Sequence, residues 1–195
     1  MRIPPSWLAA LLVALLRVES PREVSAQDLL PLVGGNGGNS FSLVCPNGFV
    51  LTGIRARRSL TLDGIGSRCR PVRANGTLGA EADEGPVWGG PGGDAHAQSC
   101  GGGAVIAQQT AVFDGARLSQ LAYHCFRWNA GTRRWDASDR RDLLVVLPAR
   151  APPAASPPPA PSTATRCPAA TRPADGLRGR AGMVVESIGI RCDDP

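Results

Sequence analysis

The sequence contains no lysine, so all 21 of its basic residues are arginines. Against 16 acidic residues, the arginines leave a formal net charge of +5. They are dispersed along the chain with acidic residues between them and form no basic stripe, so no nucleic-acid partner is predicted. The exclusive use of arginine is typical of GC-rich coding sequence, and from it we expect a bacterial source.

Residue patterns that hold metals or catalyse reactions are also missing. The only histidines are His96 and His124, and no two cysteines have the C-x-x-C spacing of common zinc sites. Neither histidine is linked by a motif to a serine or cysteine nucleophile. We therefore predict no metal, no cofactor and no catalytic residue, and expect that the protein is not an enzyme. A hydrolase whose two carboxylates meet only in the folded chain is left open.

Long hydrophobic runs are absent except at the N-terminus. There, Arg2 precedes the apolar run Trp7–Leu16, which is too short to span a bilayer, and Val24-Ser25-Ala26 fits a signal-peptidase cleavage site. We predict a signal peptide over residues 1–26, with an uncleaved surface helix as the alternative. The mature chain is then secreted, to the extracellular space or the periplasm, and has no transmembrane segment.

Six cysteines are present, all after the predicted cleavage site, as a disulfide framework in a secreted protein requires. The three intervals Cys45–Cys69, Cys100–Cys125 and Cys167–Cys192 are of nearly equal length. Because equal intervals indicate a threefold repeat, we pair each cysteine with the mate in its own repeat. Each bridge then closes a loop of about 25 residues, worth roughly 3 kcal/mol in the chain-entropy model.

The intervals belong to a longer sequence repeat. The first copy, about residues 34–79, has a glycine cluster, a short apolar strand, a cysteine, a longer strand with a turn, and a hairpin arm. The second copy, about 89–135, repeats this plan. The third, about 162–192, is degenerate because it lacks the glycine cluster and the arm. A Pro/Ala-rich tract over 148–165 is predicted to be a polyproline-like insertion, and whether the third copy packs with the first two is left open.

Each copy contains segments typical of strands and no convincing helix. The predicted strands are Ser40–Val44, Phe49–Ala56, Ala104–Gln108, Leu118–Tyr123 and Leu143–Leu147. One such unit cannot bury its own apolar face, so three should pack around a shared axis. We predict one all-β, disulfide-braced, prism-like domain over residues 27–195 with approximate threefold symmetry.

The string LVGGNGGNSF, followed by LTGIRARRSLTLDGI, resembles the opening of a jacalin-related lectin domain. The glycine segment, C-P-x-G-F and G-I-x-x-x-C are also similar to the vitelline membrane outer layer protein family, which has three repeats with cysteine pairs. Both resemblances imply a β-prism of three Greek-key sheets. They cover about Gly34–Trp135 well and Cys167–Cys192 in part.

The jacalin-related resemblance implies a sugar site built from a glycine loop and the acid of a G-x-x-x-D loop. At the acid position the first copy has Asp63, the second has Ser119 and the third has Glu186. A carboxylate can accept two hydroxyl hydrogen bonds and glycines expose backbone N–H groups, so we take Asp63 with Gly34–Gly38 as the best candidate site. Glu186 offers the same chemistry, with no glycine cluster expected beside it.

Trp88 borders the second glycine cluster and could stack on a sugar ring, whereas Trp128 and Trp135 could pair across a hairpin. The candidate ligand-binding residues are Gly34, Gly35, Gly37, Gly38, Asp63, Trp88 and Glu186. The alternative at each position is structural: a turn cap for the acids, a tight loop for the glycines and packing for the tryptophans.

Taken together, these features favour a secreted, non-enzymatic protein that binds glycans or other components of an envelope or matrix. The first alternative is a structural or protein-interaction module that binds no sugar and uses the Pro-rich tract as a spacer or docking segment. The second alternative is a hydrolase of unrecognised type.

Overall fold

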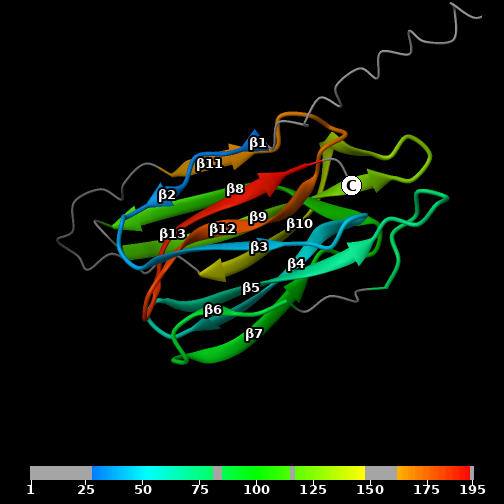
Figure 1. Ribbon diagram of the computed structural model, residues 1–195. Coiled ribbons are helices and arrows are strands. Elements are labelled where there is room, and N and C mark those ends of the chain that lie inside the picture. The colour runs from blue at the N-terminus through cyan, green and yellow to red at the C-terminus, as the bar shows by residue number, and fades with distance from the viewer. Residues whose placement is uncertain (1–27, 81–84, 115–116, 148–161, 194–195) are drawn as a thin grey trace, which may run out of the picture.

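The computed structural model describes residues 28–80, 85–114, 117–147 and 162–193, and these residues form strands and loops without a helix (Figure 1). The predicted signal peptide, and residues 148–161 of the predicted insertion, lie outside the described part. The strands are β1 (Asp28–Leu29), β2 (Val33–Gly34), β3 (Asn39–Val44), β4 (Phe49–Arg58), β5 (Leu62–Pro71), β6 (Trp88–Gly89), β7 (Asp94–Ser99), β8 (Ala104–Asp114), β9 (Arg117–Asn129), β10 (Arg134–Leu147), β11 (Thr163–Arg166), β12 (Ala174–Ala181) and β13 (Val185–Cys192). No described segment forms a helix with the length and apolar character needed to cross a membrane.

The strands form three antiparallel sheets around one hydrophobic core. Sheet I has the order β1-β13-β12-β3, with β2 also paired to β13; sheet II is β6-β5-β4-β7; and sheet III is β10-β9-β8-β11. All three sheets contribute fully buried side chains to the core, among them Leu51, Ile65, Ile106, Leu121, Leu177 and Ile190. The third copy of the repeat therefore closes the same prism as the first two, and the predicted all-β, threefold fold class is confirmed.

Each sheet combines strands from two copies of the repeat, which the sequence pattern did not indicate. The first strand of each copy leaves its own hairpin and pairs with the hairpin of another copy. Strand β3 of the first copy joins β12 of the third, β7 of the second joins β4 of the first, and β11 of the third joins β8 of the second. The exchange is cyclic, so a loop from one copy meets the hairpin loop of another.

The disulfides link the sheets in the same cyclic order. The bridges are Cys45–Cys69, Cys100–Cys125 and Cys167–Cys192, and this is the predicted pairing. In each bridge one cysteine directly follows the exchanged strand of one sheet and the other lies in, or at the end of, the hairpin of the next sheet. The bridges thus connect sheet I to II, II to III and III to I.

Most of the predicted strands are present, with one correction. The Pro/Ala-rich insertion was predicted to reach Thr165, but Thr163–Arg166 form β11, paired with β8. Thr165 is buried in β11, as a β-branched residue of a strand can be, so this part of the tract belongs to the sheet and not to the insertion. At the other end of the tract, the predicted strand Leu143–Leu147 is the last part of the long strand β10, in which Leu143 itself is exposed.

Candidate functional site

Two glycine clusters lie at the left of Figure 1, each before the first residue of β3 or β7, whereas Cys45 and Cys100 follow the other ends of these strands. Gly34–Gly38 joins β2 to β3 in sheet I, and Gly89–Gly93 joins β6 to β7 in sheet II. The first glycine of each cluster has a φ of +126° or +122° and the last has a φ of +66° or +69°. Because these values favour glycine and match in order, the two loops follow the same backbone course.

The first cluster lies against Glu186, an acid from the third copy of the repeat. The N–H of Gly35 donates to the backbone carbonyl of Glu186 at 2.9 Å. A Cβ placed on Gly37 would lie 3.2 Å from Cδ of Glu186, so the carboxylate side chain covers that glycine. We call this arrangement, Gly34–Gly38 with Glu186, the Glu186 loop site.

The second cluster lies against Asp63, an acid from the first copy. The N–H of Gly90 donates to the backbone carbonyl of Asp63 at 2.7 Å. A Cβ on Gly93 would lie 2.5 Å from Oδ2 of Asp63, and one on Gly92 would lie 3.5 Å from Oδ1. We call this arrangement, Gly89–Gly93 with Asp63, the Asp63 loop site; it repeats the contacts of the Glu186 loop site.

The predicted combination of Asp63 with Gly34–Gly38 is therefore wrong, and so is the expectation that Glu186 has no glycine cluster beside it. Both errors come from the exchanged strands. A glycine cluster travels with the first strand of its copy into the sheet of another copy, so it meets that copy's acid and not its own. All seven candidate residues do lie at this end of the prism, but in two separate sites.

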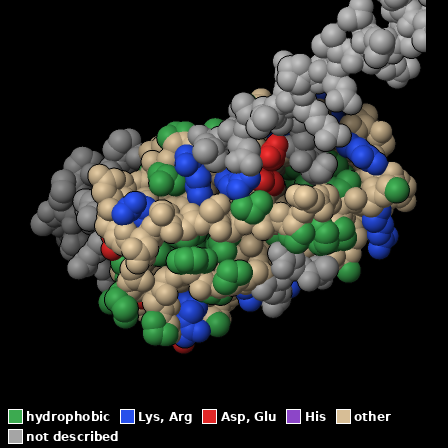
Figure 2. All heavy atoms as spheres, in the orientation of Figure 1, with side chains coloured by type: hydrophobic (Ala, Val, Ile, Leu, Met, Phe, Trp, Pro, Cys, Tyr) green, Lys and Arg blue, Asp and Glu red, His purple; other side chains and the backbone are tan. Residues whose placement is uncertain are grey.

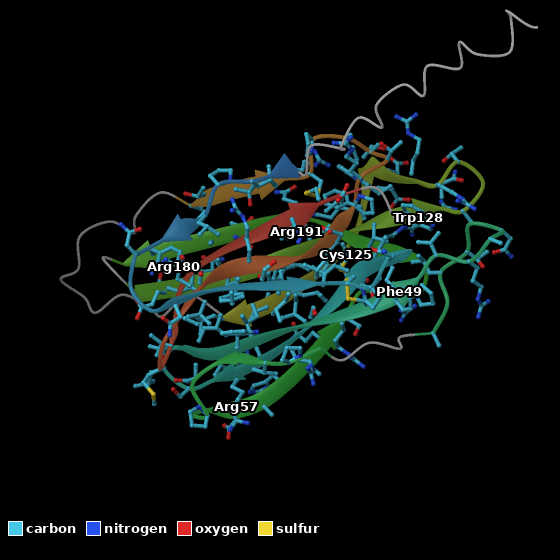
Figure 3. The ribbon with its side chains drawn as sticks, in the orientation of Figure 1. Phe49, Arg57, Cys125, Trp128, Arg180 and Arg191 are labelled. Carbon is cyan, nitrogen blue, oxygen red and sulfur yellow. A yellow bond between two sulfur atoms is a disulfide. The ribbon has the colours of Figure 1, made fainter. Side chains whose placement is uncertain are left out.

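An arginine braces each glycine loop, and sequence reasoning missed both. Arg180 donates from Nε to the carbonyl of Gly37 at 3.0 Å and from Nη2 to that of Gly38 at 2.6 Å. Arg57 donates from Nε to the carbonyl of Gly92 at 3.0 Å, and its Nη2 lies 2.5 Å and 3.2 Å from the carbonyl oxygens of the two flanking residues. Figure 3 shows both arginines at the loop end, away from the labelled Cys125 and Trp128. Charge-assisted bonds of this kind hold the loop carbonyls in place.

The two acids differ in exposure. Asp63 is only 8% exposed; its Oδ1 accepts a hydrogen bond from Oγ1 of Thr61 at 3.2 Å, and its Oδ2 has no partner among the described residues. Glu186 is half-buried. Asp63 therefore has an unused acceptor directed at the glycine loop. Leaving a buried carboxylate oxygen without a donor costs free energy, which a donor at this position would recover. Glu186 is the acid that solvent, or a ligand, reaches more directly.

Aromatic side chains border both sites. Trp88 directly precedes the second glycine cluster, is 40% exposed, and stacks on Phe41 with ring centroids 6.1 Å apart. Phe113 of sheet III borders the first cluster, because a Cβ on Gly34 would lie 2.6 Å from its ring. Sequence reasoning did not identify Phe113; the only available signal was its place just before the hairpin turn of the second copy.

Sheet III has no equivalent acid–arginine pair. Ser119 stands at the acid position and donates from Oγ to the carbonyl of Val112 at 3.1 Å. Val112 in turn occupies the position held by Arg57 and Arg180 in the other two sheets, as the strand registers show. The described part of the molecule thus holds two related loop sites and a third hairpin without their charged groups.

The remaining candidate side chains have structural roles. Trp128 and Trp135 lie opposite each other on β9 and β10, as predicted, and their indole N–H groups donate to backbone carbonyls. His124 is buried, with Nε2 at 2.8 Å from Oγ1 of Thr110 and Nδ1 at 3.3 Å from Arg140. Burial, Arg140 and Arg166 lower the pKa of His124, which keeps the ring neutral.

No protein-family model matches this chain, and no curated protein matches it. Solved structures do. A single-substitution variant of Malaysian banana lectin has a TM-score of 0.56 and 16% identity, with 88% of this chain and 100% of that chain covered. The mannose-binding jacalin-related lectin of Ananas comosus has a TM-score of 0.51 and 16% identity, with 85% and 96% covered. The artocarpin–mannotriose complex has a TM-score of 0.54 and 11% identity, with 84% and 95% covered.

At these identities the likeness establishes the fold. The chain has the β-prism fold of the jacalin-related lectins, which confirms that resemblance at the level of architecture. The resemblance to the vitelline membrane outer layer family stays a prediction.

Proposed function

We propose that this chain is a secreted, non-enzymatic, lectin-like protein that binds glycans through the Glu186 and Asp63 loop sites. The observation that carries the proposal is the repeated geometry: twice, a carboxylate lies against a glycine loop whose carbonyls are fixed by an arginine. A single arrangement of this kind could be explained by an acid that only caps a turn. Two copies, on the end of a fold shared with carbohydrate-binding proteins, favour a recognition function.

The chemistry suits sugar hydroxyls. A carboxylate accepts hydrogen bonds from two neighbouring hydroxyls, and backbone N–H groups exposed at glycines donate to their oxygens. In each site the arginine holds the glycine carbonyls, so the loop is fixed before a ligand arrives and less entropy is lost on binding. Glu186 is the more open acid, so we expect the Glu186 loop site to bind more tightly than the Asp63 loop site.

Two further features support the proposed location and ligand. Three disulfides are typical of proteins that fold in an oxidising compartment, which agrees with secretion to an envelope or matrix. Among the structurally similar proteins, the Ananas lectin is described as mannose-binding and artocarpin was solved with mannotriose. Mannose-type glycans are therefore the first probes for this chain.

Titration calorimetry with mannose oligosaccharides, preceded by a glycan array to find other sugars, tests the proposal. Glu186→Gln should weaken binding at least about tenfold, since one strong charge-assisted hydrogen bond is worth roughly 1.5–3 kcal/mol. Asp63→Asn should remove the weaker site. The matched control is Ser119→Ala in sheet III, at the same position of a hairpin without the acid, and it should bind as the unmodified chain does.

If the folded protein binds no glycan on the array, the proposal is wrong. The structural or protein-interaction alternative would then be preferred, and a pull-down with and without residues 148–161 would test it.

A further inference from the structure

The two loop sites are joined by a single hairpin loop, Ala181–Glu186, which we call the shared loop. At its start, a Cβ on Gly38 of the first cluster would lie 2.4 Å from the carbonyl carbon of Ala181. At its tip, a Cβ on Gly90 of the second cluster would lie 2.4 Å from the carbonyl oxygen of Met183. Contacts this close require glycine in both clusters, so the shared loop is wedged between the two sites.

These contacts limit the distance between the sites. The route from Glu186 to Met183, and on from Gly90 to Gly92 beside Asp63, is five residue steps along the backbone. At 3.8 Å per step these amount to about 19 Å, to which the backbone contact of Met183 with Gly90 and the contact of Gly92 with the Asp63 side chain are added. The two acids therefore face the same end of the molecule within reach of a short chain of sugars.

The surface between the sites is apolar and exposed. Met183, at the tip of the shared loop, is 73% exposed, and Trp88, next to the second cluster, is 40% exposed. Figure 2 shows hydrophobic side chains at the lower left of the face drawn, the region where β5 and β6 lie in Figure 1. If the apolar face of a sugar ring packs on Met183, both apolar surfaces leave water, which favours binding.

Leu60 provides an internal comparison. It occupies in sheet II the position that Met183 occupies in sheet I, three residues before the acid, and is 70% exposed. Among the described residues, however, only the Met183 backbone lies against the glycine cluster of a second site. The bridging role is thus specific to Met183, and Leu60 serves as its matched control.

We propose that one oligosaccharide spans both loop sites across Met183, so that the natural ligand is a glycan chain and not a monosaccharide. This inference rests on the proposed function, because it requires each loop site to bind a sugar. The middle of the chain packs on Met183 while its two ends reach the Glu186 and Asp63 loop sites. Binding of the second end is then intramolecular, which raises affinity in addition to the contact with Met183.

Calorimetry with linear mannose oligosaccharides of increasing length, from the monosaccharide upward, tests the proposal. The monosaccharide should bind two per chain. Once the oligosaccharide is long enough to span, the stoichiometry should fall to one per chain and the affinity should rise at least about tenfold. Asp63→Asn should abolish this rise with length while the Glu186 loop site still binds the monosaccharide.

The side-chain arm of the test uses Met183→Ser and Leu60→Ser. Both residues are exposed, so neither change should affect folding. Met183→Ser should reduce the gain with length at least about threefold and leave monosaccharide binding unchanged, whereas Leu60→Ser should leave both unchanged. Two ligands per chain and a flat affinity at every length would overturn the bridging proposal alone. Absence of binding by the monosaccharide and by every oligosaccharide would contradict the proposed function and this inference with it.

Discussion

His124 is a buried neutral histidine surrounded by cations. It contacts Thr110 on β8 and Arg140 on β10, and Arg166 on β11 adds to the positive field. These neighbours and burial lower its pKa below the ordinary value of about 6.5. As the pH falls below about 6.5, the unfolded chain takes up this proton before the folded chain does. The free energy of unfolding should therefore become smaller as the pH falls from about 6.5 to the lowered pKa. The loss is at most about 1.4 kcal/mol per pH unit.

Urea unfolding at a series of pH values, with His124→Gln for comparison, measures this effect. Glutamine can keep hydrogen bonds to Thr110 and Arg140 but does not titrate. The raised pKa of the buried Asp175, caused mainly by burial, acts in both proteins and cancels in the difference. As the pH falls from about 7, the free energy of unfolding should decrease less for His124→Gln than for the unmodified protein. A gap independent of pH would show that His124 titrates normally in the folded state.

At the scale of residues, the sequence identified acids more readily than their partners. Asp63 and Glu186 could be predicted because each stands at the end of a recognisable G-x-x-x-D-like loop. Arg57 and Arg180 could not, because the 21 arginines are spread along the chain and nothing in the linear order says which carbonyls they meet. Their role depends on which strands pair, and this pairing is seen only in the folded sheets.

At the scale of elements, strand positions were predictable and strand partners were not. Segments such as Ser40–Val44 and Phe49–Ala56 match β3 and β4 closely, because β-forming residues and turn signals are local properties. Pairing is a long-range property: β3 joins β12, more than a hundred residues later in the chain. The wrong assignment of Asp63 to Gly34–Gly38 follows directly from assuming that each copy forms its own sheet.

The glycine loops should be sensitive to substitution to different degrees. Gly34 and Gly48 both have positive φ, at +126° and +78°. A Cβ on Gly34 would lie 2.4 Å from the carbonyl oxygen of Glu186, whereas a Cβ on Gly48 would meet nothing within 4 Å. Gly48→Ala should then cost only the backbone strain, roughly 1–2 kcal/mol. Gly34→Ala adds the clash and should cost at least about 3 kcal/mol in total.

Urea unfolding of the two variants compares strain alone with strain plus clash. Equal losses would mean that the loop around Gly34 moves aside without cost, and the contact with Glu186 would then not fix the loop. A larger loss for Gly34→Ala supports a rigid loop at the Glu186 loop site.

At the scale of the whole molecule, each disulfide connects two sheets that are also connected by the chain of an exchanged strand. Nearly equal cysteine spacing predicted which cysteines pair, since a repeat implies equivalent bridges. Spacing could not show that every bridge connects two different sheets, because that again depends on where the first strand of each copy pairs. The covalent ring of three bridges lies at the end away from the loop sites, which leaves the loop end closed by non-covalent contacts alone.

The three bridges should stabilise the prism almost independently. They close loops with sequence separations of 24, 25 and 25 residues, and none of these loops overlaps another. In the chain-entropy model each bridge restricts its own part of the unfolded chain, so each double Cys→Ala variant should lose roughly 3 kcal/mol and losses should add. Removing one bridge still leaves all three sheets connected through the other two. Removing two frees one sheet from covalent attachment to its neighbours except through the backbone.

Urea unfolding of the three single-bridge variants and one variant lacking two bridges distinguishes the two possible origins of this stability. Additive losses place the effect in the unfolded chain. A loss in the two-bridge variant well above the sum would instead place it in the folded prism, where closing the covalent ring holds the sheets together. The loop sites contain residues from sheets I and II, which the bridge Cys45–Cys69 connects. If the bridges act in the folded prism, removal of this bridge should also weaken glycan binding. The other two single-bridge variants serve as controls.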